Sequence, residues 1–424
     1  MTYAETLSHI YALGRFGMKP GLARITRLLG ALGNPQDAFA TVHVVGTNGK
    51  GSTASILSSI LHAGGYRTGL FTSPHLISFT ERIRTDGTEI SEEAVARLAG
   101  RVMAAAPEGT TFFEIITALA ALHFAEAGVQ LAVFEAGMGG RLDATNALDG
   151  VLSVITPVSL DHTDYLGSRI AEIAVEKAGI CKAASPIVSA RQLPEAARVI
   201  KRHALELGCP LYLCGEAFEA GWREGELWYR GLGLSLDGIT PGVTGRYQAG
   251  NNACALAAAE LLSGAGFPLS PPVLAAGVQR ASWPGRMELF PGSPRLLLDG
   301  AHNPAGAAAL AEALAEIPRT RLLMVVGVMG DKELSGVLGP LLPLADQVFA
   351  VAPAIDRALP AASLASFCSA AGARAQEAGS VARGIDLARA EAKDDDLILI
   401  CGSLFTVGEA RGILLSRRFD PFRG

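Results

Sequence analysis

Short apolar runs alternate with helix-like stretches between residues 41 and about 190. The apolar runs are strand-like, and the helix-like stretches lie between them at 52–63, 91–105 and 113–127. This alternation predicts an α/β domain in which a parallel sheet carries helices on both faces. The strand-like runs are "TVHVVG", "TGLFTS", "LAVFEAG", "GVLSVITPV" and "PIVSA".

The pattern changes twice further along the chain. Residues 210–245 resemble short antiparallel strands with turns, and an Ala-rich helix is expected at 251–266. Residues 282–295 are dense in Pro and Gly and lack apolar periodicity, which indicates a hinge. The α/β alternation then restarts, with a helix expected at 304–316. Its strand-like runs are "RLLLDGA", "RLLMVVGV", "QVFAVAP" and "LILICGS".

A chain of 424 residues is too long for one core, so we expect two domains, residues 1–286 and 287–424. Two facing α/β domains usually place a site in the cleft between them. Apolar residues make up 49% of the chain and charged residues 18%, a balance typical of compact globular proteins rather than disordered ones.

Charge and cysteine usage narrow the class of partner. A net charge of −5 provides no basic surface for nucleic acid. No apolar run is long enough to span a membrane, and the N-terminal residues lack the apolar core of a signal peptide. The six cysteines are scattered without a CxxC pair, so we expect reduced thiols in a cytoplasmic protein.

The strongest chemical signal is "GTNGKGST" at residues 46–53, between a buried strand and a helix. Glycines let backbone N–H groups approach an anion, and the helix N-terminus adds partial positive charge. Lys50 adds a full charge, and Ser52 or Thr53 can reach Mg²⁺. These features predict a phosphate site, most simply for ATP. The spacing departs from the general P-loop rule because Gly51 intervenes, so an ordinary turn with a surface lysine is the alternative.

Two polar residues follow neighbouring strand-like runs. Glu135 ends an apolar strand, where it is either a metal ligand or a surface carboxylate. His162, beside Asp161, follows the next strand and would lie near Glu135. A lone histidine is more often structural, and an imidazole is an unusual ligand for Mg²⁺.

Three charged residues nearby are ambiguous from sequence. Arg141 and Asp143 could orient a substrate or form a salt bridge with each other. Lys177, in the helical "AVEKAGI", is most simply a solvated helix lysine.

Polar groups recur in the second half of the chain. Asn251 begins the Ala-rich helix, and Arg286 lies at the hinge, where it could bind phosphates on domain closure. "LLLDGAHNPAG" ends a strand with Asp299 and His302 and starts a helix at Pro304, a favourable first helical residue. Asp299 could contact a ribose or cap this helix.

Ten motifs in order resemble the folylpolyglutamate synthase/dihydrofolate synthase family, a branch of the Mur ligases, over nearly the whole chain. They are "VVGTNGKGST", "TSPHL", "ERI", "EAGMGGRLDATN", "LDHTDYLG", "EKAGI", "WPGR", "DGAHNP", "GVMGDKE" and "CGSLF". The resemblance implies a P-loop ATPase domain like the Mur ligase central domain, followed by a smaller Rossmann-like α/β domain that binds glutamate. The family's loop carries the extra glycine at Gly51.

The resemblance also implies roles for individual residues. Lys50 would hold ATP phosphates, Lys177 matches a lysine that the family carbamylates, and His302 lies in the glutamate half of the cleft. Two Mg²⁺ ions are implied, with Ser52, Ser73, Glu135 and His162 as ligands. ATP contacts are implied for Thr47, Asn48, Gly49, Lys50, Gly51, Ser52, Thr53, Asn251, Arg286 and Asp299.

The pterin side is a looser match. The implied pterin-binding residues are Phe113, Leu142, Asp143 and Ala144, together with the segment 16–25. Tyr247 stands where the family commonly has a histidine.

The implied activity is ATP-dependent addition of L-glutamate to a folate, and also to dihydropteroate, through an acyl phosphate in a cytoplasmic monomer. The alternatives are folylpolyglutamate synthesis alone, another Mur-type amide ligase, or a nucleotide-binding switch without ligase chemistry. Cell-wall Mur ligases usually carry a further domain before the loop, which we do not expect because the loop begins at residue 46. A switch would need the loop but not Glu135, His162 and Lys177.

Overall fold

The strand that precedes the glycine loop lies in the middle of the largest sheet. In the computed structural model, which describes residues 1–14 and 20–421, β1 (Ala40–Val45) pairs in parallel with β5 (Leu131–Glu135) and with β6 (Gly150–Ile155). Within those residues the large sheet has the order β4-β3-β2-β5-β1-β6-β7-β8. Its other strands are β2 (Thr68–Phe71), β3 (Ile83–Thr85), β4 (Thr88–Glu89), β7 (Ile187–Ser189) and β8 (Leu211–Leu213).

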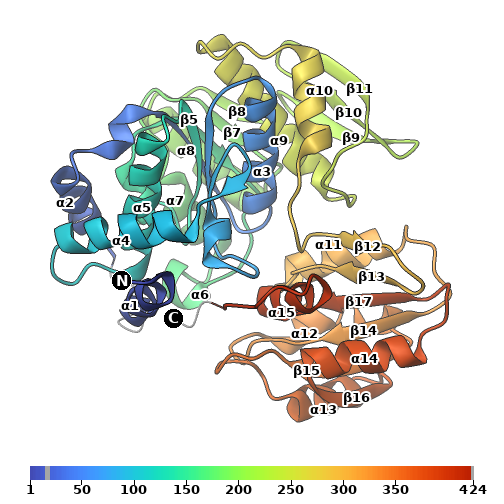
Figure 1. Cartoon of the computed structure of the whole chain (residues 1–424). Coiled ribbons are helices and arrows are strands. Elements are labelled where there is room, and N and C mark those ends of the chain that lie inside the picture. Colours follow the sequence, from blue (N-terminus) through green and yellow to red (C-terminus); the bar gives the residue numbers. More distant parts are fainter. Residues whose placement is uncertain (15–19, 422–424) are drawn as a thin grey trace.

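Helices cover both faces of this sheet, as the alternation predicts (Figure 1). One face packs against α3 (Lys50–Ala63), α9 (Gln248–Gly264) and α10 (Pro271–Arg280). The helices that form the other face are α1 (Tyr3–Gly14), α2 (Ala23–Ala31), α4 (Glu92–Ala105), α5 (Phe112–Glu126), α7 (Ile170–Ala178) and α8 (Pro194–Glu206). The inner strands are therefore buried on both faces, which explains their apolar runs.

Two expectations for this domain are wrong in part. The large sheet is mixed, because β3 and β4 pair antiparallel at its edge. Within 210–245, β8 pairs in parallel with β7, so only the later strands form an antiparallel sheet, in the order β11-β10-β9. These strands are β9 (Glu219–Arg223), β10 (Glu226–Arg230) and β11 (Ser235–Ile239). A three-residue strand such as β8 is too short to show which partner it will take.

The second domain is a separate α/β unit with the strand order β12-β13-β17-β14-β15-β16. Its strands are β12 (Glu288–Phe290), β13 (Arg295–Leu298), β14 (Leu322–Val326), β15 (Gln347–Ala352), β16 (Ala375–Ser380) and β17 (Leu397–Cys401). Its helices are α11 (Pro304–Leu314), α12 (Leu334–Leu338), α13 (Ala361–Ala370), α14 (Val381–Glu391) and α15 (Leu404–Leu414). The first three pack on one face and the last two on the other.

The predicted hinge is shorter than residues 282–295. Residues 288–290 form β12, which pairs antiparallel with β13 and so belongs to the second domain. Pro and Gly flank this strand on both sides, so the local sequence gives no strand signal. Its pairing with β13 is what makes it a strand. The chain therefore passes from one domain to the other before Glu288. The domain boundary at 286 stays a prediction. Figure 1 shows the second domain, in orange and red, joined to the first by this short segment.

The remaining helical turns are short. They are α6 (Thr163–Leu166), η1 (Pro35–Ala38), η2 (Phe79–Arg82), η3 (Ala144–Ala147) and η4 (Leu342–Leu344). None of the helices in the described residues is long and apolar enough to span a membrane.

Candidate active site

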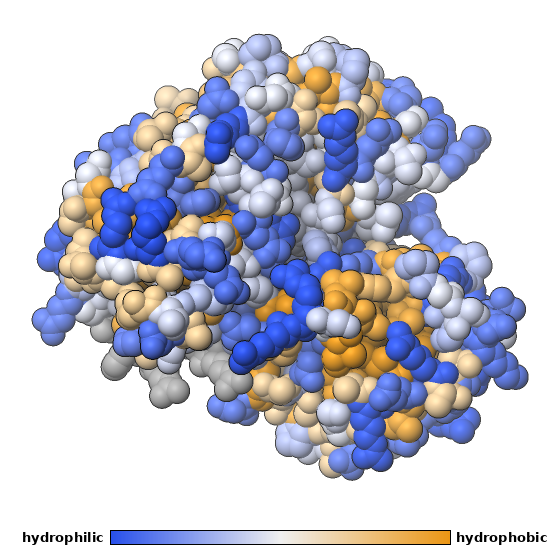
Figure 2. Space-filling view, viewed as in Figure 1, coloured by the Kyte–Doolittle hydropathy of each residue, from blue (hydrophilic) through white to orange (hydrophobic). Residues whose placement is uncertain are grey.

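A cavity of about 1410 Å³ opens between the two domains and is lined by both. Figure 2 shows a hollow at the boundary between the domains, with blue and pale residues of the first domain above it and an orange, hydrophobic area of the second domain below it. The cavity wall includes every predicted site residue except Thr53 and Lys177. Thr53 is fully buried, and its hydroxyl donates to Asn251 Oδ1 (3.4 Å), so it faces α9 rather than the cavity. The part of the predicted pterin segment 16–25 at residues 16–19 lies outside the described residues.

The glycine loop at 46–53, called the P loop from here on, connects β1 to α3. Gly49 precedes α3 in the left-handed region (φ +85°), and a Cβ there would lie 2.3 Å from Asn251 Oδ1. Only glycine satisfies both conditions. Lys50 begins the helix, and its Nζ donates to Thr47 O (3.3 Å). The sequence therefore shapes an anion site at a helix N-terminus.

The extra glycine in the P loop has a structural explanation. A Cβ on Gly51 would lie 2.4 Å from Cζ2 of Trp283, so the indole lies directly on the first turn of α3. Trp283 comes from the segment that crosses between domains. The departure from the general P-loop spacing thus makes room for the interdomain connection.

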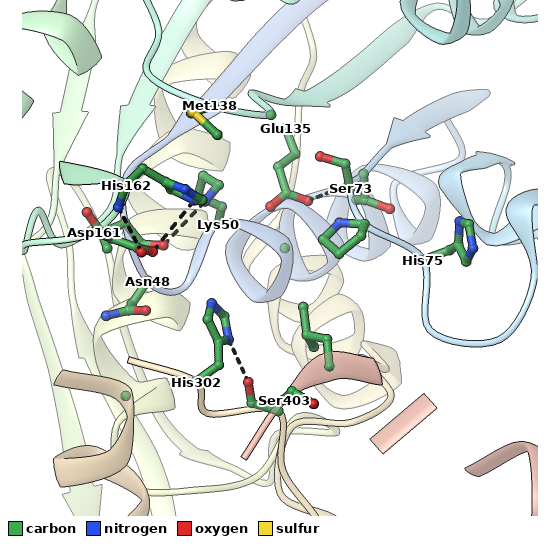
Figure 3. A pocket seen from close by; sticks show the side chains of 18 of the residues that line it. Asn48, Lys50, Ser73, His75, Glu135, Met138, Asp161, His162, His302 and Ser403 are labelled. Atoms are coloured by element: carbon green, nitrogen blue, oxygen red, sulfur yellow. Dashed lines mark hydrogen bonds and ion pairs between the residues drawn. The ribbon is translucent and has the colours of Figure 1, made fainter. Parts of the chain in front are cut away.

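Glu135 and His162 do not follow adjacent strands, which corrects the sequence interpretation. β1 is inserted between β5 and β6, so the P loop emerges between these two side chains. Figure 3 shows Glu135 and His162 on opposite sides of Lys50. Both residues line the same cavity. The insertion of β1 is a long-range pairing that no local pattern could indicate.

Glu135 is well suited to a cation. Its side chain is buried, and the hydrogen bond that it receives from the described residues is from Ser73 N (3.1 Å). Burial raises the pKa of Glu135, while the charge of Lys50 opposes that rise. The described residues contain no cluster of three His, Cys, Asp or Glu side chains around a metal position. A divalent ion here would thus take further ligands from hydroxyls, phosphates and water, as Mg²⁺ does in nucleotide sites.

His162 lies at a strained turn and is partly exposed. Its φ of 51° is in the left-handed region, and its Nε2 lies 3.8 Å from Asp161 Oδ2. Burial lowers the pKa of His162, although Asp161 opposes this effect. Lys332, from the second domain, also reaches Asp161, with Nζ 3.8 Å from Oδ1. The loop is thus a contact between the domains as well as a candidate ligand site.

Lys177 is not a solvated helix lysine, so that interpretation is wrong. Its side chain is buried, and Nζ donates to Gly46 O (2.7 Å) at the start of the P loop. Burial first, and then the charge of Lys50, lowers the pKa of Lys177 to about 7. The helix period could not indicate this burial because the groups that enclose Lys177, at Gly46 and Gly140, come from loops far away in the sequence.

The segment after Glu135 forms the wall on the other side. Arg141 pairs with Glu176 (2.7 Å) and not with Asp143. Asp143 is buried and accepts hydrogen bonds from Met138 N (2.9 Å) and Thr145 Oγ1 (2.6 Å), which shape the loop. Leu142 is exposed and Ala144 buried.

Phe113 lies against the backbone of this wall. A Cβ on Gly137 would come within 2.5 Å of its ring. The ring also lies 5.8 Å from that of Phe71, at a tilt of 52°. Phe113 belongs to the first turn of α5, so the start of that helix forms part of the cavity wall.

The second domain faces the P loop with the segment 299–303. Asp299 is buried and accepts hydrogen bonds from Tyr247 Oη (2.9 Å) and Met287 N (3.0 Å), so it does not cap α11. Arg286 lines the cavity and donates to Gly285 O (3.1 Å). His302 Nδ1 lies 2.8 Å from Gly300 O, and burial lowers the pKa of His302 to about 4.

The cap of α11 is Asn303, which the sequence analysis did not single out. Its Oδ1 accepts from Gly306 N (2.8 Å), and its Nδ2 donates to Asn48 Oδ1 of the P loop (2.9 Å). Asn48 returns a bond from Nδ2 to Asn303 Oδ1 (3.3 Å). An Asn directly before a helix-starting Pro is a recognisable cap signal, but the pairing with Asn48 is not local.

The cavity thus joins an anion-binding loop, a buried carboxylate and a second α/β domain. The chain matches the family described as Mur ligase middle domain over residues 44–259, and the Mur ligase, glutamate ligase domain over residues 285–404. The chain belongs to the Mur ligase family. Its relatives place it in the folylpolyglutamate synthase/dihydrofolate synthase branch of these ligases.

Two curated relatives of this Mur ligase illustrate the likeness. A probable bifunctional folylpolyglutamate synthase/dihydropteroate synthase of Halobacterium salinarum is 39% identical over 97% of this chain and 51% of the relative. The chain therefore spans about half the length of that protein. A dihydrofolate synthase/folylpolyglutamate synthase of Bacillus subtilis is 35% identical over 96% of this chain and 98% of the relative.

Solved structures share the whole arrangement. FolC of Escherichia coli, in complex with DHPP and ADP, has a TM-score of 0.91 at 32% identity, with 98% of each chain covered. The bifunctional folylpolyglutamate synthase/dihydrofolate synthase of Yersinia pestis, in complex with AMPPNP and a Mn ion, has a TM-score of 0.89 at 32% identity. That match also covers 98% of each chain. The fold of this Mur ligase is thus shared over almost its full length.

Proposed function

We propose that this chain is an ATP-dependent ligase that adds L-glutamate to a folate, and also to dihydropteroate. The observation that carries the proposal is the single cavity between the domains, which gathers the P loop, Glu135 and the segment 299–303. Membership of the family and the names of its relatives support the same activity. We infer a monomer, because both halves of the cavity come from one chain.

The P loop and the hinge would hold the nucleotide. The proposed ATP contacts are Thr47, Asn48, Gly49, Lys50, Gly51, Ser52, Asn251, Arg286 and Asp299. Ser52, Ser73, Glu135 and His162 would hold up to two divalent ions, which supply charge neutralisation for the phosphates when bound. Since Thr53 faces α9, we expect Ser52 to provide the P-loop hydroxyl.

The reaction would run in two displacements within this cavity. The substrate carboxylate attacks the γ-phosphorus, so an acyl phosphate forms and ADP leaves. Lys50 and Arg286 offset the charge that builds on the transferred group. The neutral amine of glutamate then attacks the acyl carbon, and the carbon–oxygen bond breaks to release phosphate. The amine proton is lost as the amide forms.

His302 would orient glutamate rather than act as a cation. Burial keeps the imidazole neutral at pH 7, and the contact of Nδ1 with Gly300 O places the proton on Nδ1. Nε2 is then an acceptor for an N–H group of the neutral glutamate amine. The start of α5 and residues 142–144 would contact the pterin ring through Phe113, Leu142, Asp143 and Ala144.

Lys177 is positioned for carbamylation. A lysine with a pKa of about 7 is largely neutral near physiological pH, and the neutral amine is the form that attacks CO₂. The nitrogen–carbon bond forms, one proton is lost, and the group becomes an anion beside Lys50. This anion would exchange a repulsion between two cations for an attraction.

The test is release of phosphate from ATP in the presence of Mg²⁺. We expect release to require both glutamate and a pterin substrate, with dihydropteroate and tetrahydrofolate assayed side by side. A switch would hydrolyse ATP slowly and ignore both co-substrates. Activity with tetrahydrofolate alone would restrict the enzyme to folylpolyglutamate synthesis.

Substitution of the P-loop lysine gives the matched variant. Lys50→Ala should lower glutamate-dependent phosphate release at least about 100-fold, because a preorganised charge at the phosphates is lost. Lys201→Ala, which removes an exposed lysine of α8 that pairs with Glu216, should be as active as the parent protein. Equal activity of the Lys50 variant, folded as judged by circular dichroism, contradicts the proposed role.

A further inference from the structure

The segment after α15 returns to the first domain and makes a further contact between the domains. Asp420 N donates to Ile77 O (2.9 Å), and Asp420 O lies 2.9 Å from His75 Nε2. Gly408 of α15 also lies against Leu76, whose carbonyl oxygen would be 2.2 Å from a Cβ at that position. Residues 75–77 therefore rest on two parts of the second domain.

His75 links Asp420 to a buried arginine, Arg82. Arg82 Nε donates to His75 Nδ1 (2.7 Å), so the imidazole proton lies on Nε2 and is donated to Asp420 O. Both side chains are nearly inaccessible, with 2% of Arg82 and 6% of His75 exposed. The two bonds use both ring nitrogens of His75, which fixes the plane of the ring.

Glu81 holds the loop that carries His75. Its carboxylate accepts hydrogen bonds from three successive backbone N–H groups, those of Leu76 (2.7 Å), Ile77 (3.1 Å) and Ser78 (3.2 Å). The "ERI" and "TSPHL" motifs are thus one structural unit, in which Glu81 sets the loop and Arg82 sets the histidine. No role in nucleotide binding is needed to explain His75, Glu81 or Arg82.

Arg82 in turn lies against the aromatic start of α5. Its guanidinium carbon is 5.4 Å from the centre of the Phe112 ring, within the range of a cation–π contact. Phe112 adjoins Phe113, the residue proposed to contact the pterin ring, and His75, Arg82 and both phenylalanines line the cavity. A continuous series of contacts therefore leads from the second domain to the proposed pterin wall.

We propose that His75 and Arg82 are positioning residues for the pterin substrate and that the backbone of Asp420 holds them in place. The wall formed by Phe112 and Phe113 then has its productive geometry only while the segment 419–421 is docked. The affinity for the pterin substrate therefore depends on this contact. The affinity for the nucleotide does not. The inference rests on the proposed function for its substrate, although the contacts can be tested without turnover.

Two near-isosteric variants separate the two bonds of His75. Asn places an amide oxygen close to the position of Nδ1, so His75→Asn keeps an acceptor for Arg82 and loses the bond to Asp420. Gln places an amide N–H close to the position of Nε2, so His75→Gln keeps the bond to Asp420 and loses the acceptor for Arg82. Asp420→Pro removes the N–H donated to Ile77 and perturbs the same contact from outside the cavity.

We expect each variant to raise the KM for the pterin substrate about tenfold, the usual effect of one buried hydrogen bond to a charged or constrained group. The KM for ATP and for glutamate should change less than about twofold, because no contact of their proposed residues is altered. A general loss of stability would change all three. Wild-type KM values in His75→Asn or Asp420→Pro overturn the role of the segment 419–421, and wild-type values in His75→Gln overturn the role of Arg82.

Hydrogen–deuterium exchange of the protein without substrates gives an independent reading. Amides at 112–120, the first half of α5, should exchange faster in all three variants than in the parent protein. His62→Asn, at an exposed position on α3, is the control and should leave this exchange unchanged. If the parent protein lacks ligase activity, the proposed function fails, while the exchange data still decide the inference. Unchanged exchange at 112–120 in every variant overturns it.

Discussion

Lys177 shows how burial changes the chemistry of a single residue. Its ammonium group would have to remain charged beside Lys50 and out of contact with water, so its protonated form is disfavoured. The same residue on a solvated helix would titrate near 10.5. The difference makes the amine reactive and also couples its protonation to folding.

The coupling gives a signed prediction for Lys177→Met. Between about pH 7 and 10.5 the unfolded lysine is protonated and the folded one is neutral, so the unfolded state binds more protons. The free energy of unfolding of the parent protein, relative to the variant, should therefore rise by about 1.4 kcal/mol per pH unit in this window. This difference in the free energy of unfolding should be lowest below pH 7. Urea unfolding at pH 7.5, 8.5 and 9.5 in CO₂-depleted buffer measures it.

Lys201→Met is the control for this prediction. Lys201 is half exposed on α8 and pairs with Glu216, so its substitution should change the free energy of unfolding by less than about 1 kcal/mol at each of the three pH values. A flat difference for Lys177→Met as well would mean that the folded lysine keeps its ordinary pKa.

At the residue level the sequence is informative where chemistry is local. Glycines at 46, 49 and 51 and the position of Lys50 specify an anion site before any contact is known. The environment of Lys177 and the partner of Asp299 depend on distant segments, and the local pattern gives the wrong or no answer for both. Asn303 lies between these cases, because its cap is local and its pairing with Asn48 is not.

At the scale of elements, the first turn of α3 is shaped by the segment between domains. Gly51→Ala should raise helix propensity by about 1 kcal/mol, yet the added Cβ meets the Trp283 indole. Overpacking of this kind typically costs about 1–3 kcal/mol. We therefore expect the free energy of unfolding to fall, as measured by urea denaturation.

A second substitution separates the clash from other effects of Gly51→Ala. Trp283→Leu removes the ring that the new methyl group meets, so the double variant should be more stable than the sum of the two single effects predicts. If the changes in free energy of unfolding add exactly, the new methyl group at position 51 does not clash with Trp283.

Element boundaries follow the sequence closely in the interior of the fold and poorly at its edges. The predicted helix at 52–63 is α3, and 304–316 corresponds to α11, because their apolar faces are continuous. β8 and β12 were misassigned because each has three residues and acquires its identity from its partner strand. The insertion of β1 between β5 and β6 is likewise a property of the sheet and not of any segment.

At the scale of the whole molecule, pairs of side chains connect the two halves of the cavity. Asn48 and Asn303 exchange hydrogen bonds, and Lys332 approaches Asp161. Both pairs join the side of the proposed nucleotide site to the second domain. Ligands that favour the joined state should therefore strengthen each other's binding.

Asn303→Ser tests this linkage. Serine can still cap α11 but is too short to reach Asn48, so the helix is retained and the pair is lost. In the parent protein, saturating glutamate should tighten binding of Mg·ADP, measured by isothermal titration calorimetry. In the variant we expect Mg·ADP alone to bind about fivefold more weakly, because the joined state loses the pair that stabilises it, and saturating glutamate should recover most of that loss, so the tightening grows. Equal tightening in both proteins would show that the Asn48–Asn303 pair does not contribute to the linkage between the two ligands.

Leu76 lies where three segments of the second half of the chain converge. Gly285, Val407 and Gly408 all approach it or its neighbours, and Asp420 is bonded one residue away. A rigid-body rotation that keeps these attachments must pivot near Leu76. Such a rotation would separate the Asn48–Asn303 and Asp161–Lys332 pairs, whose polar groups can turn to water. The Arg246–Glu316 pair and the bond from Tyr247 to Asp299 also join the domains and would resist it. We therefore expect the two domains to rotate about this attachment during each proposed reaction cycle, with reactants entering along the edge opposite the pivot.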